Sequence, residues 1–108
     1  MKKFPKSLYP MALKAFRMCA PPILPIKVRR CRITGAGQCT LIYDRKKPVR
    51  FEIKLNSLLP PVSLVDCLIH EWAHALSWGS NHPSFEDHGP EWGISYATLY
   101  RILEEMPQ

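Results

Sequence analysis

The sequence of 108 residues predicts an α+β fold, in which a first helix precedes a small antiparallel three-stranded sheet and two further helices. Three observations support this fold class. Apolar residues recur every three or four positions near both ends of the chain and around residues 63–76, as in amphipathic helices. Three shorter segments between residues 26 and 55 are strand-like, and short turn sequences separate them. A chain of this length buries one modest core, so we expect a single domain over residues 1–108.

The first helix is predicted from its apolar spacing, and Pro21-Pro22 ends it because proline cannot continue a helix. Its apolar positions are Leu8, Met11, Ala12, Ala15, Phe16 and Cys19. The three predicted strands are Ile26 to Ile33, Cys39 to Tyr43 and Val49 to Leu55. The connections Gly35-Ala36-Gly37 and Asp44 to Pro48 are short, which favours an antiparallel meander.

The second helix follows Pro60-Pro61, and Ser63 is its expected N-cap. At about 100° per residue, its apolar side chains gather on one face. They are Val65, Leu68, Ile69, Trp72 and Leu76. His70 and His74 point almost opposite, so we expect both imidazoles to face away from the core.

The last helix is expected to begin near Gly89-Pro90, because proline is favoured in the first turn of a helix. Its apolar positions Trp92, Tyr96, Leu99 and Leu103 follow at helical spacing. This places His88 at the entrance of the helix. For Tyr96 we favour core packing over a role in stabilising a reacting oxyanion.

The segment His70-Glu71-Trp72-Ala73-His74 predicts a zinc site suited to hydrolysis. Residues four apart on a helix project only about 40° apart, so both imidazoles can reach one metal ion. A neutral imidazole is a good zinc ligand. Glu71 lies beside the metal, where a carboxylate can take a proton from water that the metal has acidified. The alternative, two solvated surface histidines, leaves the adjacent glutamate and a third histidine downstream unexplained.

A catalytic zinc usually takes three protein ligands and leaves a fourth position for water. His88 is the candidate for the third ligand, because an imidazole suits zinc and a turn lies beside it. The other candidates within reach in the sequence are Glu91, His82, Glu86, Asp87 and Asp66. The metzincin pattern is excluded, since it requires glycine and histidine where this chain has Ser77 and Ser80.

The stretch from Leu64 through Trp92 resembles the SprT-like zinc metalloprotease domain, the family that includes Spartan. The resemblance rests on HEWAH followed by HGPEW. It implies a zincin-like fold, a Zn²⁺ cofactor held by His70, His74 and His88, and Glu71 as catalytic acid/base. It also implies substrates among DNA-associated proteins. The four cysteines form no C-x-x-C pair, so we expect a minimal form without the family's C-terminal zinc ribbon.

Charge is unevenly distributed along the chain. Residues 1–54 contain fourteen Lys or Arg against Asp44 and Glu52, a net charge of +12, whereas residues 55–108 carry −6. The basic half predicts contact with nucleic acid, and a solvated basic surface is the alternative. A protein or peptide is the expected substrate, and it could pair with the edge of Val49 to Leu55 or of Asn56 to Leu59.

No apolar stretch approaches membrane-spanning length, and Lys2-Lys3 is not followed by a signal-peptide core. We therefore expect a cytoplasmic monomer with reduced thiols and no membrane partner. The sequence predicts a zinc-dependent endopeptidase that hydrolyses peptide bonds with metal-activated water. The alternative is a non-enzymatic nucleic-acid-binding or adaptor protein with a structural zinc.

Overall fold

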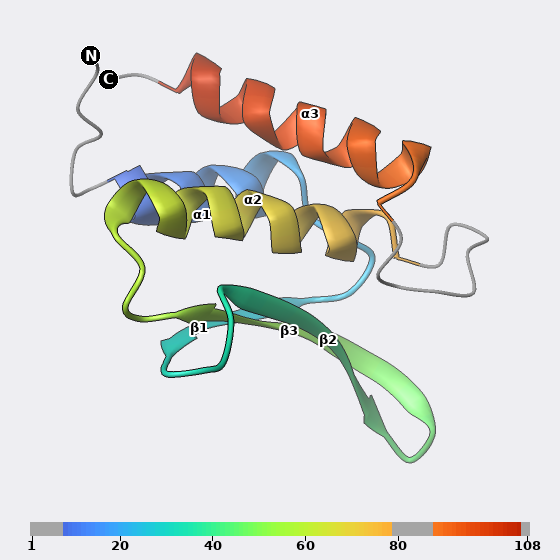
Figure 1. Ribbon diagram of the computed structural model, residues 1–108. Coiled ribbons are helices and arrows are strands. Elements are labelled where there is room, and N and C mark those ends of the chain that lie inside the picture. The colour runs from blue at the N-terminus through green and yellow to red at the C-terminus, as the bar shows by residue number, and fades with distance from the viewer. Residues whose placement is uncertain (1–7, 79–87, 107–108) are drawn as a thin grey trace.

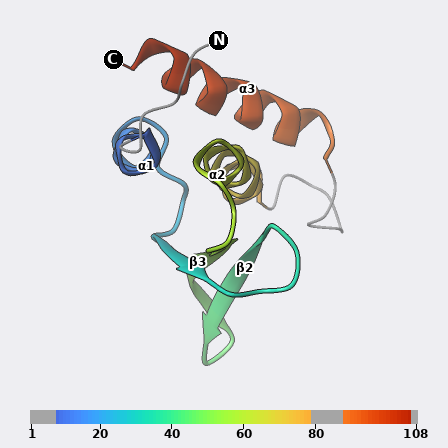
Figure 2. The same ribbon diagram turned by 60° about the vertical axis from the view of Figure 1, so that its left-hand side comes forward.

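A computed structural model describes residues 8–78 and 88–106. It has three helices and a three-stranded mixed sheet, which confirms the predicted α+β layout. The elements are α1 (Leu8–Cys19), β1 (Ile26–Cys31), β2 (Gly37–Asp44), β3 (Lys47–Asn56), α2 (Pro61–Leu76) and α3 (Pro90–Glu105). Figures 1 and 2 show α2 in the middle, with the sheet on one side, α3 on the opposite side and α1 beside it.

Helix α1 forms as its apolar spacing predicts, and buries Leu8, Ala12 and Phe16. Phe16 packs against Trp72 of α2, with ring centroids 5.9 Å apart. The Trp72 indole N–H also donates a hydrogen bond of 2.9 Å to the carbonyl of Ala20, just beyond the helix. Because Trp72 is fully buried, this bond satisfies a polar group that would otherwise lose its partner in the core.

The sheet has the strand order β1-β3-β2, so β3 is central. Strand β2 pairs antiparallel with β3, but β1 pairs with β3 in parallel, from Ile26 opposite Phe51 to Cys31 opposite Asn56. The prediction of a purely antiparallel meander is therefore wrong. The burial pattern agrees with the observed order, because Phe51, Ile53 and Leu55 of β3 are all fully buried.

The loop of residues 32–36 explains this topology, because it crosses the end of β3 instead of joining neighbouring strands. The Asn56 side-chain Nδ2 donates to the carbonyls of Ile33 and Gly35 at 3.2 and 2.8 Å. The Asn56 backbone N–H donates to the Ala36 carbonyl at 2.8 Å. Gly35 has φ of +87°, a conformation that glycine adopts without strain. A short loop is thus compatible with a crossover here.

The hairpin between β2 and β3 turns through only two residues, Arg45 and Lys46, with φ of 50° and 69°. Positive φ at both central residues defines the tight turn whose twist matches the flanking strands. Both strands consequently extend further toward the turn than the sequence predicted. Figure 1 shows the hairpin projecting beyond the rest of the sheet.

Helix α2 begins at Pro61, with Pro60 as its N-cap, and Ser63 lies inside its first turn. The prediction of Ser63 as N-cap is wrong, because the ring of Pro61 already fixes the helical φ and its missing N–H costs nothing at that position. Because α2 lies in the middle of the fold, residues on more than one of its faces are buried. Besides the predicted core positions Val65, Leu68, Ile69 and Trp72, the buried residues include Leu64, Cys67, Glu71, Ala73 and Ala75.

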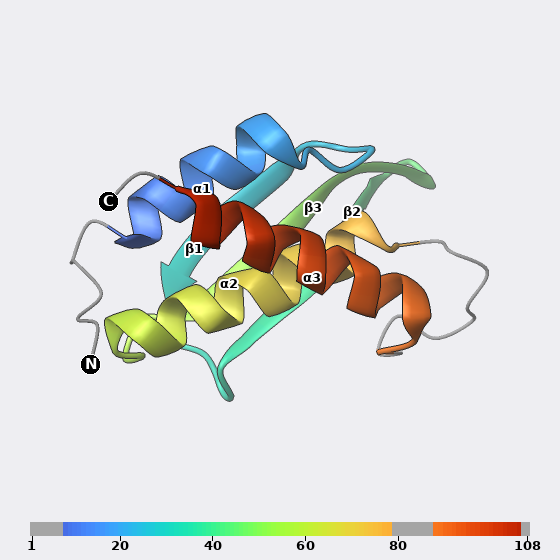
Figure 3. The same ribbon diagram turned by 90° about the horizontal axis from the view of Figure 1, so that it is seen from above.

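Helix α3 starts at Pro90, as the sequence predicts, and buries Leu99 against the core. Seen from above, α3 lies across α2 and beside α1 (Figure 3). Within residues 8–78 and 88–106, none of the helices has the length and apolar character needed to cross a membrane.

Gly37 offers a test of how β2 packs on α2. A Cβ added there would collide with the Sγ of Cys67 and lie 3.1 Å from the carbonyl oxygen of Lys54. We expect Gly37→Ala to lower the free energy of unfolding by about 1–3 kcal/mol in denaturant titrations, as overpacking does. Cys67→Ala in the same chain should recover part of this loss.

Gly93→Ala is the matched control, because nothing lies within 4 Å of a Cβ at that position in α3. It should stabilise by up to about 1 kcal/mol through helix propensity. Equal effects at the two glycines would contradict the close packing of β2 on α2.

Candidate metal centre

Three histidines converge on one point at the ends of α2 and α3. His70 and His74 stand one turn apart on α2, and His88 lies two residues before the start of α3. The Nε2 atom of His70 is 3.3 Å from that of His74. The His88 Nε2 atom is 3.2 Å from each of the other two. The three predicted ligands are thus brought together, close enough to bind one metal ion.

These distances fit a shared cation. Zinc–imidazole bonds of about 2.0–2.1 Å in tetrahedral geometry place ligand nitrogens about 3.3 Å apart. Without a cation, neutral rings could satisfy at most part of such a triangle by hydrogen bonding, since each neutral imidazole has one N–H and one lone pair. The chemistry of the three donors therefore fits a divalent metal of the kind that imidazole ligands prefer.

The other candidates for the third ligand do not join this cluster. Among the described residues that could hold a metal, only the three histidines form such a group, so Glu91 and Asp66 lie outside it. His82, Glu86 and Asp87 fall between residues 79 and 87, outside the described residues. His88, which the sequence singled out, is the one that the fold brings to His70 and His74.

Burial keeps two of the imidazoles in the form that binds metals. Desolvation, followed by the charges of the neighbouring His70 and His88, lowers the pKa of His74 to about 4. The pKa of His70 is also lowered, mainly by desolvation and then by His88. Both rings are therefore neutral near pH 7, and a metal can bind them without displacing protons.

Glu71 is the one buried polar or charged residue among those described, with 7% of its surface exposed. Burial raises the pKa of its carboxyl to about 7. It lies beside His70 in the wall of an open cavity that all three histidines also line. A carboxyl with a pKa near neutrality can both accept and return a proton. The acid/base role of Glu71 stays a prediction, which its position in the cavity wall permits.

The indole of Trp92 contacts all three imidazoles, whereas the sequence predicted Trp92 only as an apolar position of the last helix. Its ring centroid lies 4.6 Å from His88, 5.1 Å from His70 and 5.8 Å from His74. Its N–H donates to the carbonyl of His70 at 3.3 Å. Trp92 therefore joins α3 to α2 directly beneath the cluster. His88 precedes α3, so helical spacing did not predict this contact, and the only clue was that the two residues are close in sequence.

The cavity in front of the histidines has a volume of about 720 Å³. Its walls come from the three histidines, Glu71, Trp78 and residues of β2, namely Gly37, Gln38, Cys39, Thr40, Leu41 and Tyr43. Trp78 lies here and packs edge-on against Phe51, with ring centroids 5.4 Å apart. In the described part of the chain, nothing pairs with the outer edge of β2.

This arrangement corrects the prediction of which strand edge receives the substrate. Val49 to Leu55 belongs to β3, which is bonded to a strand on each side along residues 51–55 and so has no free edge there. Asn56 to Leu59 forms a turn, closed by hydrogen bonds from the N–H groups of Leu58 and Leu59 back to Asn56. The free edge beside the cluster is that of β2.

The two cysteines nearest the cluster are not poised as thiolates. Burial, followed by the charge of Glu71, raises the pKa of Cys39 to about 12 and that of Cys67 to about 11. Only the thiolate acts as a nucleophile or metal ligand, so both groups stay inert near neutral pH. All four cysteines are free.

No known protein family, curated protein or solved structure matches this chain. The assignment of a function therefore depends on the geometry of the site and on the resemblance of the motif.

Removing the third histidine tests the cluster. We expect the protein to bind one equivalent of a divalent metal, and His88→Ala to weaken that binding by at least about a hundredfold. Changes in groups that only support a ligand already cost 10–100-fold. Chelator competition measures both affinities. Glu91→Gln, which alters the rejected candidate, should bind as tightly as the unmodified chain, and unchanged affinity in His88→Ala would refute the three-histidine site.

Proposed function

We propose that this protein is a zinc-dependent endopeptidase. The observation that carries the proposal is the convergence of three Nε2 atoms within 3.3 Å of one another, beside a buried carboxylate and open to a cavity. A set of three imidazoles leaves a tetrahedral zinc with a fourth position, as in catalytic and not structural zinc sites. A structural site would close that position with a fourth protein ligand.

Zinc is the metal that this donor set favours. Three nitrogens without sulfur or oxygen ligands suit borderline metals such as zinc, whereas magnesium and calcium prefer oxygen. When bound, zinc supplies Lewis acidity, which acidifies water and polarises a carbonyl group. His70, His74 and His88 would hold it, and Trp92 fixes the orientation of their rings by contact from below.

Glu71 performs the proton transfers in this proposal. Its carboxylate accepts the proton of the attacking water and later returns a proton to the leaving amine. The low exposure of Glu71 strengthens its electrostatic interactions, because the surrounding protein responds less than water does. Peptide-bond hydrolysis requires both transfers, since an unprotonated amine anion is a poor leaving group.

The outer edge of β2 is the proposed docking edge for an extended substrate. Its backbone N–H and C=O groups are free along one side in the described structure, and residues of β2 line the cavity beside the histidines. An added strand bonds through main-chain groups, which tolerates many side chains. This mode therefore suits a protease that accepts varied sequences.

The same proposal follows from the resemblance of Leu64 through Trp92 to the SprT-like domain. A substrate among DNA-associated proteins and a cytoplasmic location stay predictions, which neither the fold nor the cluster tests.

Replacing Glu71 separates catalysis from metal binding. We expect Glu71→Gln to retain one zinc and to lower cleavage of an unstructured protein by about 10²–10⁴-fold, the usual contribution of a general base. His74→Ala should lose both zinc and activity. Glu105→Gln removes the same charge at the exposed end of α3 and should stay fully active. An active Glu71→Gln protein would overturn the mechanism, and zinc-loaded wild type without activity would favour the adaptor alternative.

A second candidate function, contact with nucleic acid, is favoured by where the fold places the basic residues. Residues 26–56, which form the sheet, contain nine Lys or Arg against Asp44 and Glu52, a net charge of +7. Strand alternation puts Lys27, Arg29, Arg50 and Lys54 on the face opposite Phe51 and Ile53. We call these four residues the basic sheet face. It lies on the far side of the sheet from the helices (Figure 1).

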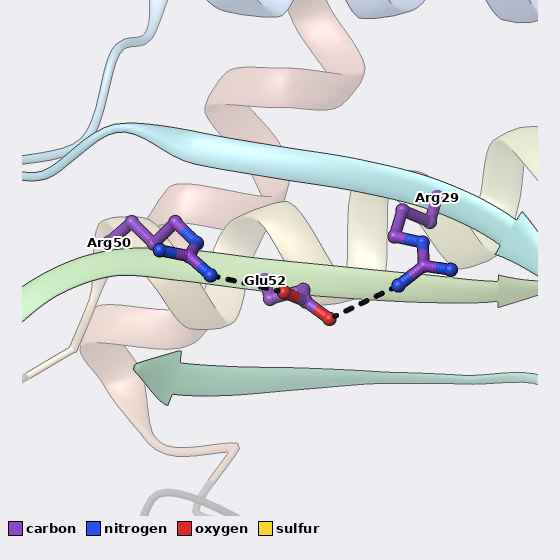
Figure 4. A network of polar contacts seen from close by, with 3 residues as sticks. All are labelled: Arg29, Arg50 and Glu52. Carbon is purple, nitrogen blue, oxygen red and sulfur yellow. Dashed lines mark ion pairs between the residues drawn. The ribbon is translucent and has the colours of Figure 1, made fainter. Parts of the chain in front are cut away.

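One acid interrupts this face. Glu52 lies between Arg29 and Arg50, at 4.0 and 3.9 Å from their guanidinium nitrogens (Figure 4). The pairs are long and the two arginine side chains are about half exposed, so each pair is worth about 0–1 kcal/mol and the arginines can turn toward phosphates at little cost. The face has no aromatic residue on which bases could stack, so backbone contact independent of sequence is the expected mode.

The salt dependence of binding tests the basic sheet face. We expect a duplex DNA oligonucleotide to bind with an affinity that falls linearly with salt on logarithmic axes. Reversing two charges, Lys27→Glu with Lys54→Glu, should lower that slope by about 2, as measured by fluorescence anisotropy. Lys14→Glu with Arg101→Glu, on α1 and α3, is the control and should change it less. No binding at low salt would exclude this function.

A further inference from the structure

A second cavity, of about 530 Å³, adjoins the metal centre over the first half of α2. It shares Gly37, His70 and Glu71 with the larger cavity, so the two meet at the proposed reaction centre. Its remaining walls come from α2, α3 and the loops before β2 and α2. These lining residues are Ala36, Leu59, Ser63, Asp66, Cys67 and Tyr96. A substrate chain that crosses the centre would therefore have side chains in both cavities.

Asp66 carries the charge of this second cavity. It stands four residues before His70 on α2, so the two side chains lie on the same side of the helix. It is exposed, and no Lys or Arg among residues 8–78 and 88–106 forms an ion pair with it. Tyr96 lines the same cavity, and after burial the charge of Asp66 is the next cause that raises the pKa of its phenol.

The surroundings strengthen the negative potential of this cavity. The described residues 61–78 and 88–105 contain one basic residue, Arg101, against five acids, and the basic sheet face lies on the opposite side of the sheet. The positive end of the α2 dipole opposes this potential, but it amounts to about half a charge and fades within the first turn. Asp66 lies in the second turn and carries a full charge. The carboxylate therefore dominates.

We propose that the second cavity is a subsite for a lysine or arginine side chain of the substrate, and that Asp66 is its specificity-determining residue. The inference rests on the proposed peptidase function and narrows its substrate class. The ammonium or guanidinium group pairs with Asp66. The aliphatic part of the side chain packs on half-buried Leu59 and on the ring of Tyr96, as long basic side chains commonly do.

The spacing along α2 sets the position of this basic residue in the substrate. Asp66 and His70 are four residues apart, or about 6 Å along the helix axis. An extended peptide advances about 3.3 Å per residue. The recognised side chain therefore belongs to a residue within about two positions of the cleaved bond.

The test uses three sets of otherwise identical quenched fluorescent peptides, with lysine, norleucine or glutamate scanned through the three positions on each side of the cleaved bond. Norleucine matches the lysine stem without its charge. At one position we expect lysine to raise kcat/KM about twofold to fivefold over norleucine, mainly through KM, as a partly exposed ion pair would. Glutamate at that position should be the poorest substrate.

Charge changes at residue 66 identify the source of the preference. Asp66→Asn should bring the lysine-to-norleucine ratio close to one, and Asp66→Lys should invert the preference toward glutamate. Glu104→Gln, which removes an exposed acid near the end of α3, is the matched control and should keep the ratio of the unmodified protein. A ratio that does not change in Asp66→Lys would overturn the subsite.

Binding separates the failure of this inference from that of the proposed function. The zinc-loaded Glu71→Gln protein is titrated with the same peptides and followed by fluorescence anisotropy. A lysine preference that depends on Asp66, without cleavage by the unmodified protein, would support the subsite and refute the peptidase. Cleavage by the unmodified protein without a charge preference would support the peptidase and refute the subsite. Neither binding nor cleavage would refute both.

Discussion

The position of α2 between the sheet and α3, with α1 at its side, is the constraint on which the rest of the structure depends. A helix covered on both sides cannot turn or slide without losing core contacts, because buried side chains such as Trp72, Leu68 and Ile69 have no exposed surface to spare. His70, Glu71 and His74 belong to this helix, so their directions are set by the core. The cluster is therefore held by packing on residues that have no part in the chemistry.

Much of this arrangement could be predicted because it is local in the sequence. Three features depend only on residues that are close together in the sequence. They are the spacing of His70 and His74, the apolar positions of α1 and the proline at the start of α3. The pairing of β1 with β3 could not be predicted, since it depends on the loop at residues 32–36 crossing over Asn56, which is 20 or more positions later. Short loops usually join adjacent strands, and here a side-chain amide made the exception stable.

The site shows the same division between local and long-range information. His88 was predicted from residue type and a neighbouring turn, but its meeting with His70 and His74 requires α3 to lie across α2 at one particular place. Trp92 fixes that place, through contacts with three imidazoles and a hydrogen bond to the His70 carbonyl. Sequence patterns identified Trp92 as apolar and helical. They contain no information about which surface of α2 it would meet.

A bound metal would add to this architecture as well as to its chemistry. Two of the three histidines belong to α2, and the third precedes α3, so one ion links two elements whose other direct contacts near the site include the ring and N–H of Trp92. In a domain this small, the core leaves little stability in reserve, and metal binding to the folded state stabilises it directly. The same three nitrogens would thus hold the metal and, through it, join α2 to α3. Binding of the metal would then complete the site and stabilise the fold in the same step.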